Sequence, residues 1–118
     1  MNAFAVGGFL AALGVLLGAF GAHTLRDIGA TRLGWWTTAT QYLFVAALGI
    51  MLSGIFDRVQ RIGSGPATAL LAGAILFSGS LYAMGLGGPR WLGAVTPFGG
   101  IALVAGYVWM GVCALRSH

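Results

Sequence analysis

The residues of this chain that could take part in chemistry are few, and most of them are hydroxyls. Ser78, Ser80 and Tyr82 lie inside one apolar stretch, in the order Phe-Ser-Gly-Ser-Leu-Tyr. Ser78 and Tyr82 are four residues apart, so on a helix they share a face. Such a face could line a path for a small solute or touch a cofactor. We favour instead hydrogen bonds of the serines to their own preceding carbonyls or to a neighbouring helix, each worth about 0.6 kcal/mol on average in a membrane.

Ionisable residues are scarcer still. The chain has six arginines, no lysine and only two acidic residues, Asp27 and Asp57. None of these lies within the long apolar stretches, where ion-coupled carriers and proton relays generally place such groups. His23 follows the first apolar stretch and His118 ends the chain, so a haem held between two histidines is not expected.

Motifs for catalysis or metal binding are also absent from the sequence. There is no His-x-x-His, Cys-x-x-Cys or paired-carboxylate motif to hold a metal. No Gly-x-Ser-x-Gly segment marks a nucleophile, and the glycines lie in apolar stretches rather than in a phosphate-binding turn. We therefore expect no enzyme, no cofactor and no metal site.

The composition requires a membrane. Apolar residues make up 58% of the 118 residues and charged residues only 7%, whereas a soluble domain is about 25% charged. Four apolar stretches are each long enough to cross a bilayer as a helix, since about 20 helical residues rise about 30 Å. They cover about residues 3–22, 37–56, 66–86 and 97–115. The sequence predicts one all-α domain, residues 1–118, folded as a polytopic membrane four-helix bundle.

The connections between the stretches carry helix signals. Ser64 and Gly65 precede Pro66, and Thr96 precedes Pro97, which are arrangements typical of helix starts. Residues 24–27 have the spacing of a capping box. We therefore also allow for a short interfacial helix between the first and second spans.

Topology follows from the charges. Four spans place both ends of the chain on one side, and the arginines divide three against three between the two sides. The free amino group favours cytoplasmic termini. Trp35, Trp36 and Trp91 all lie in the first and third connections, which predicts an aromatic belt at one membrane interface. The arginines are scattered rather than clustered, so no nucleic-acid partner is expected.

Small residues recur at four-residue spacing in three of the spans. They are Gly14, Gly18 and Ala22 in the first, Gly65, Ala69 and Gly73 in the third, and Ala102 and Gly106 in the fourth. Each series forms a flat stripe on which another helix can pack closely. We expect the stripes to pack the bundle internally, and the alternative is a face for self-association or for another membrane subunit.

Three segments together carry a family resemblance. They are Gly-Ala-Phe-Gly-Ala-His at 18–23, Leu-Phe-Ser-Gly-Ser-Leu-Tyr at 76–82 and Val-Thr-Pro-Phe-Gly-Gly at 95–100. In this order the chain resembles the YgdD-type family of small four-helix membrane proteins (domain of unknown function 423, which includes transmembrane protein 256-like proteins). The resemblance implies four spans, an inner or organellar membrane and no established biochemical activity, and we expect the bacterial inner membrane.

The resemblance also bears on individual residues. The positions that match the family pattern are His23, Ser78, Ser80, Tyr82 and Thr96. Members commonly have a histidine one turn after the tyrosine that Tyr42 matches, and this chain has Ala46 there. A family-wide role for that histidine would therefore not extend to this chain.

Two functional hypotheses remain. The first is a non-catalytic accessory, assembly or structural subunit that acts through helix–helix contacts with other membrane proteins or with itself, in addition to the lipid bilayer. The alternative is a small channel or carrier for a neutral or weakly polar solute, lined by Ser78, Ser80, Tyr82 and Thr96.

Overall fold

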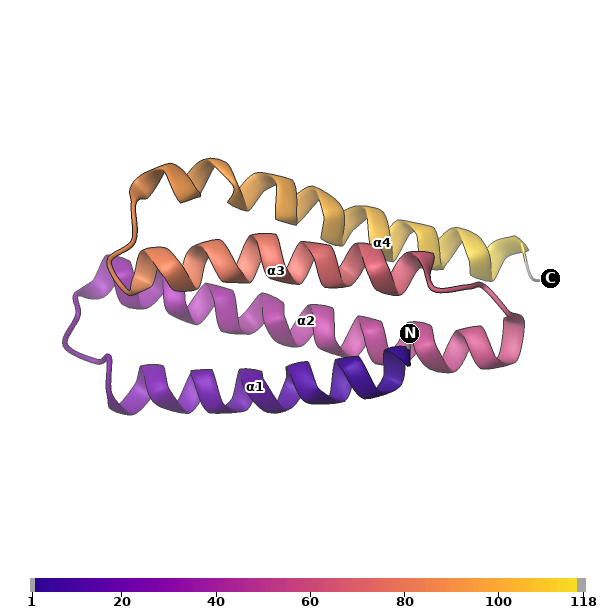
Figure 1. Cartoon of the computed structure of the whole chain (residues 1–118), viewed down its shortest axis with the longest axis horizontal. Coiled ribbons are helices and arrows are strands. Elements are labelled where there is room, and N and C mark those ends of the chain that lie inside the picture. Colours follow the sequence, from indigo (N-terminus) through magenta and orange to yellow (C-terminus); the bar gives the residue numbers. More distant parts are fainter. Residues whose placement is uncertain (1, 117–118) are drawn as a thin grey trace.

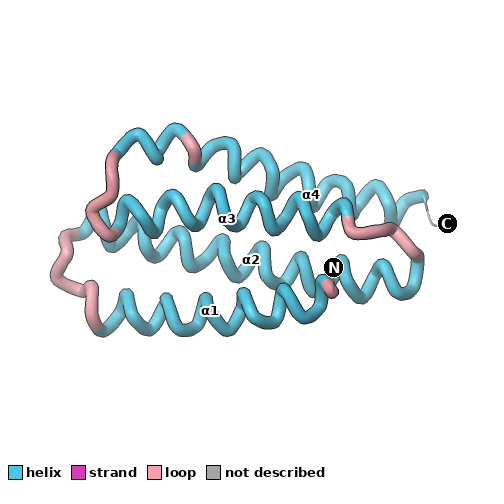
Figure 2. Tube along the Cα trace, in the orientation of Figure 1, coloured by secondary structure: helices cyan, strands magenta, loops and turns pink. Residues whose placement is uncertain are grey.

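The structure, a computed structural model, describes residues 2–116, and this part of the chain is built from four long helices. They are α1 (Ala3–His23), α2 (Ala30–Gln60), α3 (Gly65–Gly85) and α4 (Thr96–Arg116), with a short 3-10 helix, η1 (Arg90–Ala94), before α4 (Figures 1 and 2). All four long helices are apolar enough to cross a membrane. The predicted all-α membrane class is confirmed, while His118 lies outside the described residues.

The loop after α1 differs from the expectation. No interfacial helix forms there: Thr24 is the C-cap of α1, residues 24–28 form turns and bends, and Gly29 has a positive φ of 103° that separates them from α2. The Leu33 N–H donates to the Gly29 carbonyl, which begins α2 well before the predicted span. The residues assigned to an interfacial helix therefore divide between a turn and the first turns of a long α2.

The helices are arranged as an open row. α2 and α3 pack against each other in the middle, α1 packs on α2, and α4 packs on α3 (Figure 1). Within their most apolar windows, 44% of the residues of α2 and of α3 are buried, against 17% in α1 and in the η1–α4 segment. The two flanking helices therefore turn most of their surface outward.

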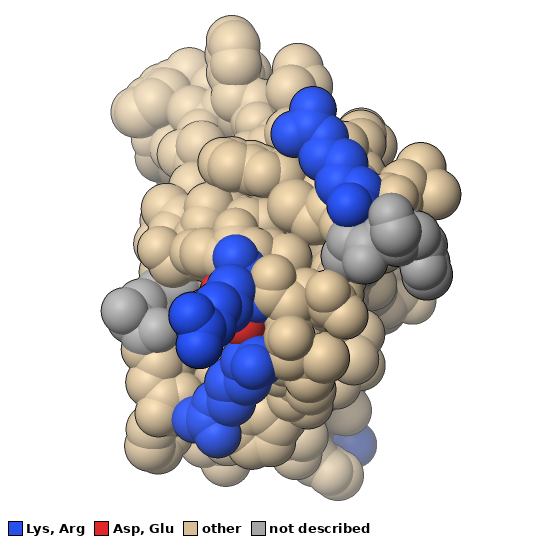
Figure 3. Space-filling view, turned by 90° about the vertical axis from the view of Figure 1, so that its right-hand side faces the viewer, with Lys and Arg blue, Asp and Glu red and all other residues tan. Residues whose placement is uncertain are grey.

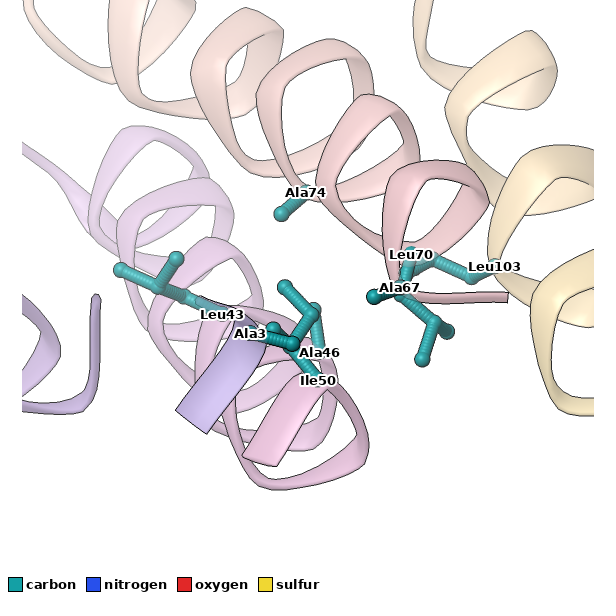
Figure 4. Close-up of a cluster of buried hydrophobic side chains, with 8 residues drawn as sticks. All are labelled: Ala3, Leu43, Ala46, Ile50, Ala67, Leu70, Ala74 and Leu103. Carbon is teal, nitrogen blue, oxygen red and sulfur yellow. The ribbon is translucent and has the colours of Figure 1, made fainter. Parts of the chain in front are cut away.

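The apolar core is formed mainly by the two central helices, with one residue each from α1 and α4 (Figure 4). Its buried members are Ala3, Leu43, Ala46, Ile50, Ala67, Leu70, Ala74 and Leu103. Ala46, one turn after Tyr42, is fully buried. A methyl group thus fills this site in the centre of the bundle.

The packing of α1 on α2 uses glycines that are seven residues apart, not four. Gly7, Gly14 and Gly21 are buried. A side chain added at these positions would overlap Met51, Phe44 and Trp36, respectively. Seven residues are two helical turns, the spacing of left-handed helix packing.

The four-residue stripe of α1 is used only in part. Gly14 belongs to the buried series, and Gly18 lies near the methyl group of Thr40. Ala22 is exposed.

The stripes of α3 and α4 face each other. Gly65 lies under the ring of Trp109. Gly73 packs against Leu103, and Gly106 packs against Leu70. Ala69 and Ala102 are half-buried beside them.

The start of α4 makes the closest backbone approach in this pair of helices. A Cβ atom at Gly99 would lie 2.7 Å from the Cα atom of Phe77 and 2.8 Å from the carbonyl carbon of Leu76, both of which belong to the α3 backbone. At Gly100 a Cβ atom would meet only the Phe77 ring, at 3.7 Å. Backbone atoms cannot move aside as a side chain can. A side chain at position 99 is therefore not tolerated, whereas a small one at position 100 is.

We expect Gly99→Ala to destabilise the protein by about 1–3 kcal/mol, the usual cost of overpacking, and Gly100→Ala to leave the stability nearly unchanged. Equilibrium unfolding of the two variants in the same mild detergent measures the difference. Equal stability of the two variants would contradict the close approach of α4 to α3.

Candidate functional site

The polar side chains of the central helices form an interhelical cluster, Thr40 of α2 with Ser78 and Tyr82 of α3, which we call the hydroxyl cluster. The Thr40 and Tyr82 hydroxyls are 2.7 Å apart and share a hydrogen bond. Ser78 donates to the Ala39 carbonyl at 2.8 Å. Both α3 residues therefore bond to α2.

Trp36 closes one end of the hydroxyl cluster. Its indole N–H donates to the Leu17 carbonyl of α1 at 2.7 Å, and its ring lies edge-on to the Tyr82 ring with centroids 4.5 Å apart. The side chain is only 4% exposed. Trp36 is thus a core residue that joins three helices, and its assignment to an interfacial belt was wrong.

The signal that could have placed Trp36 inside is Gly21. Added side-chain atoms at Gly21 would overlap the indole ring, so the glycine provides the space in which the ring lies. The sequence shows the glycine but not the partner, because the contact depends on how α1 and α2 are aligned along each other.

Ser80 points away from the hydroxyl cluster. Its hydroxyl is 2.5 Å from that of Thr96, the first residue of α4, and also bonds to the Phe77 carbonyl at 3.0 Å. Ser80 therefore lies on the α4 side of α3, whereas Ser78 and Tyr82 lie on the α2 side. Ser78, Ser80 and Tyr82 thus link α3 to both of its neighbours.

Two further bonds join α2 to the other helices. The Arg32 Nε–H donates to the Gly85 carbonyl at 2.9 Å, near the end of α3. The Tyr107 hydroxyl of α4 donates to the Val45 carbonyl. Each pair of packed helices is thus linked by at least one hydrogen bond from a side chain.

The end of α3 is closed by its glycines. Gly87 has a left-handed φ of +99°, and its N–H donates to the Met84 carbonyl while the Gly88 N–H donates to the Ala83 carbonyl. This is the Schellman arrangement, which satisfies the last carbonyls of a helix. It fixes where the loop to η1 begins.

The arrangement favours packing over solute passage. Ser78, Ser80, Tyr82 and Thr96 are all bonded to neighbouring groups, and they divide between two sides of α3. A shared polar lining would require these bonds to break. His23 is exposed at the end of α1 and is not part of the cluster. Among the described residues, no three His, Cys, Asp or Glu side chains lie together as metal ligands would.

Comparisons with known proteins agree with the sequence resemblance. The profile of a family described as "Protein of unknown function (DUF423)" matches residues 17–100. The chain is 39% identical to the UPF0382 membrane protein YwdK of Bacillus subtilis, with 94% of each chain covered. It is also 39% identical to the UPF0382 inner membrane protein YgdD of Escherichia coli, with 95% of this chain and 86% of the relative covered. No solved structure matches.

The Thr40–Tyr82 bond can be measured with a double-mutant cycle. We expect Thr40→Val and Tyr82→Phe to be coupled by about 0.6 kcal/mol of unfolding free energy, the average for hydrogen bonds between membrane helices, and by no more than about 1.7 kcal/mol. Tyr42→Phe, on an exposed part of α2, is the control and should show no coupling to Thr40→Val. Strictly additive effects of the first pair would show that the bond contributes nothing to the fold.

Proposed function

The chain belongs to the DUF423 family of membrane proteins, and from this we propose that it is a non-catalytic accessory, assembly or structural subunit of the bacterial inner membrane. It acts through helix–helix contacts, either with other membrane proteins or between copies of itself. Catalysis, cofactors and solute transport are not part of this proposal.

The open row of helices is the observation that supports the proposal most. α1 packs mainly on α2 and α4 mainly on α3, so each flanking helix presents a long apolar surface outward. On α1 this surface includes Phe9, 79% exposed, and Leu16, 67% exposed. Lipid can cover such surfaces, and so can another helix.

Outward glycines favour a helix as one of the partners. A side chain added at Gly8 of α1 or at Gly111 of α4 would meet nothing within 4 Å. Packing inside the chain therefore does not require a glycine at either position. Helix propensity does not favour one either, since glycine is a poor helix former compared with alanine. In membranes, small residues at a helix surface allow another backbone to approach closely.

The internal hydroxyls also support the proposal, because they are already used in hydrogen bonds. Ser78, Ser80 and Tyr82 are bonded to neighbouring helices. A side chain that holds the fold together in this way is not free to bind a substrate.

The proposal also includes the side of the membrane on which the two termini lie. Along the helix axes, both described ends of the chain lie on the side of the molecule where α2 connects to α3 (Figure 1). Arg58, Arg61 and Arg116 belong to this side and are balanced by three arginines on the other, so the positively charged amino group is what favours the cytoplasm for this side. We therefore propose that the amino and carboxyl termini are cytoplasmic.

We expect Gly8→Leu or Gly111→Leu to reduce the yield of cross-linked assemblies in native membranes at least about fivefold, equivalent to about 1 kcal/mol. The added side chain keeps another backbone away without touching the rest of this chain. Cross-linking followed by mass spectrometry identifies the assemblies, and a thermal scan in detergent should show a melting temperature that is not lowered, since leucine is a better helix former than glycine.

Val108→Leu is the matched control, since Val108 is already a large, 59% exposed side chain on α4. It should leave the cross-linked yield unchanged. A protein that is strictly monomeric and has no reproducible membrane partner would contradict the proposed function.

A further inference from the structure

A cavity of about 290 Å³ lies at the end of the molecule where α1 and α3 begin. We call it the amino-end pocket. Its lining comes from all three helices that meet there, α1, α2 and α3. The lining residues that matter most are Asn2, Phe4, Ser53, Asp57, Arg58 and Ser64.

Ser53 is the feature of this pocket that packing does not explain. The residue is fully buried, with 0% of its surface exposed. Its hydroxyl is a buried side-chain oxygen with no hydrogen-bond partner among the described residues. A serine in a helix commonly bonds to a carbonyl of its own preceding turn, and Ser53 lacks this bond. A buried hydroxyl without a partner is destabilising. Ser53 is therefore available to a group that occupies the pocket.

Two helix starts converge on the same pocket. The start of α1 lies directly on α2, where a Cβ atom at Gly54 would be 2.8 Å from the backbone nitrogen of Phe4. The start of α3 is at Ser64, whose side chain makes no capping bond. The first N–H groups of a helix have no acceptor within it and carry partial positive charge. At α1 the Asn2 side chain already accepts the Ala5 N–H at 3.1 Å, so an anion is favoured by the remaining first-turn N–H groups of α1 and by the uncapped start of α3.

The charged side chains of the pocket require that its ligand carry a positive charge as well as a negative one. Arg58 lines the pocket together with Asp57, and arginines gather around a small acidic patch at this end of the molecule (Figure 3). One Asp57 oxygen accepts the Gly63 N–H at 2.6 Å, which leaves the other oxygen for a further donor. A simple anion would be repelled by this carboxylate, whereas a ligand with both signs of charge would satisfy both parts of the pocket.

We propose that the amino-end pocket binds a phospholipid headgroup in which a phosphate is followed by a primary ammonium group, as in phosphatidylethanolamine. The phosphate accepts hydrogen bonds from the Ser53 hydroxyl and the first N–H groups of α1, beside Arg58. The ammonium group donates to Asp57. Spanning helices begin at the depth of the lipid headgroups, so the pocket is at the right level for such a ligand.

Native mass spectrometry of the full chain, tagged at its carboxyl end and freed of lipid in detergent, tests the proposal. The probes are dioctanoyl lipids with ethanolamine, choline or glycerol headgroups, together with soluble glycerophosphoethanolamine and inorganic phosphate. We expect the ethanolamine lipid to bind at least about fivefold more tightly than the other two lipids, and the soluble probes to bind more weakly than the lipid.

Three variants separate the parts of the site. Ser53→Ala should weaken ethanolamine-lipid binding about tenfold, since a hydrogen bond to a charged group is lost, and should raise the melting temperature of the lipid-free protein. Asp57→Asn keeps the oxygen that accepts the Gly63 N–H and should remove the preference for ethanolamine over choline. Thr31→Ala, on the exposed opposite end of α2, should change neither binding nor melting.

Several outcomes would overturn the proposal. Equal binding of the choline lipid, or tighter binding of the glycerol lipid, would exclude the role of Asp57. Glycerophosphoethanolamine or phosphate binding as tightly as the lipid would assign the pocket to a soluble ligand. An unchanged or lowered melting temperature for Ser53→Ala would show that water already satisfies the hydroxyl.

Discussion

The structure depends on the close approach of helix backbones in lipid, where the hydrophobic effect does not drive helices together. Lipid tails are as apolar as leucine, so burial of apolar surface adds little between membrane helices, and contact must come from packing and hydrogen bonds. Glycines provide that contact along α1, at Gly7, Gly14 and Gly21, and at Gly99 where α4 begins. Once the backbones are this close, the hydroxyls of α3 reach the helices on either side.

The same constraint explains what the sequence could and could not predict. Each span was predictable because it must satisfy its own backbone in lipid, which needs only a long uncharged stretch. The buried position of Trp36 was not, since it depends on Gly21 facing that ring across the α1–α2 contact. The division of Ser78 and Ser80 between two helices likewise follows from the neighbours of α3, which spacing alone does not identify.

The open row connects the fold to the proposed role. Because the polar side chains of α3 hold the centre together, the outer surfaces of α1 and α4 are left for lipid or for other helices. The amino-end pocket is a separate feature at one end of the row, formed where α1 and α3 start against α2. The proposed partners would pack on the faces of the flanking helices, and the proposed lipid headgroup would bind in the pocket.

Whether the helices form an open row can be tested directly by disulfide trapping in a Cys113→Ser background. One cysteine pair at Gly18 and Thr40 joins α1 to α2, where a Cβ atom at Gly18 would lie 3.4 Å from the Thr40 methyl group. A second pair, at Val15 and Val108, is on the outward surfaces of α1 and α4. The account predicts rapid disulfide formation within one chain for the first pair and none for the second. An equally rapid intrachain disulfide between α1 and α4 would show a closed bundle and contradict it.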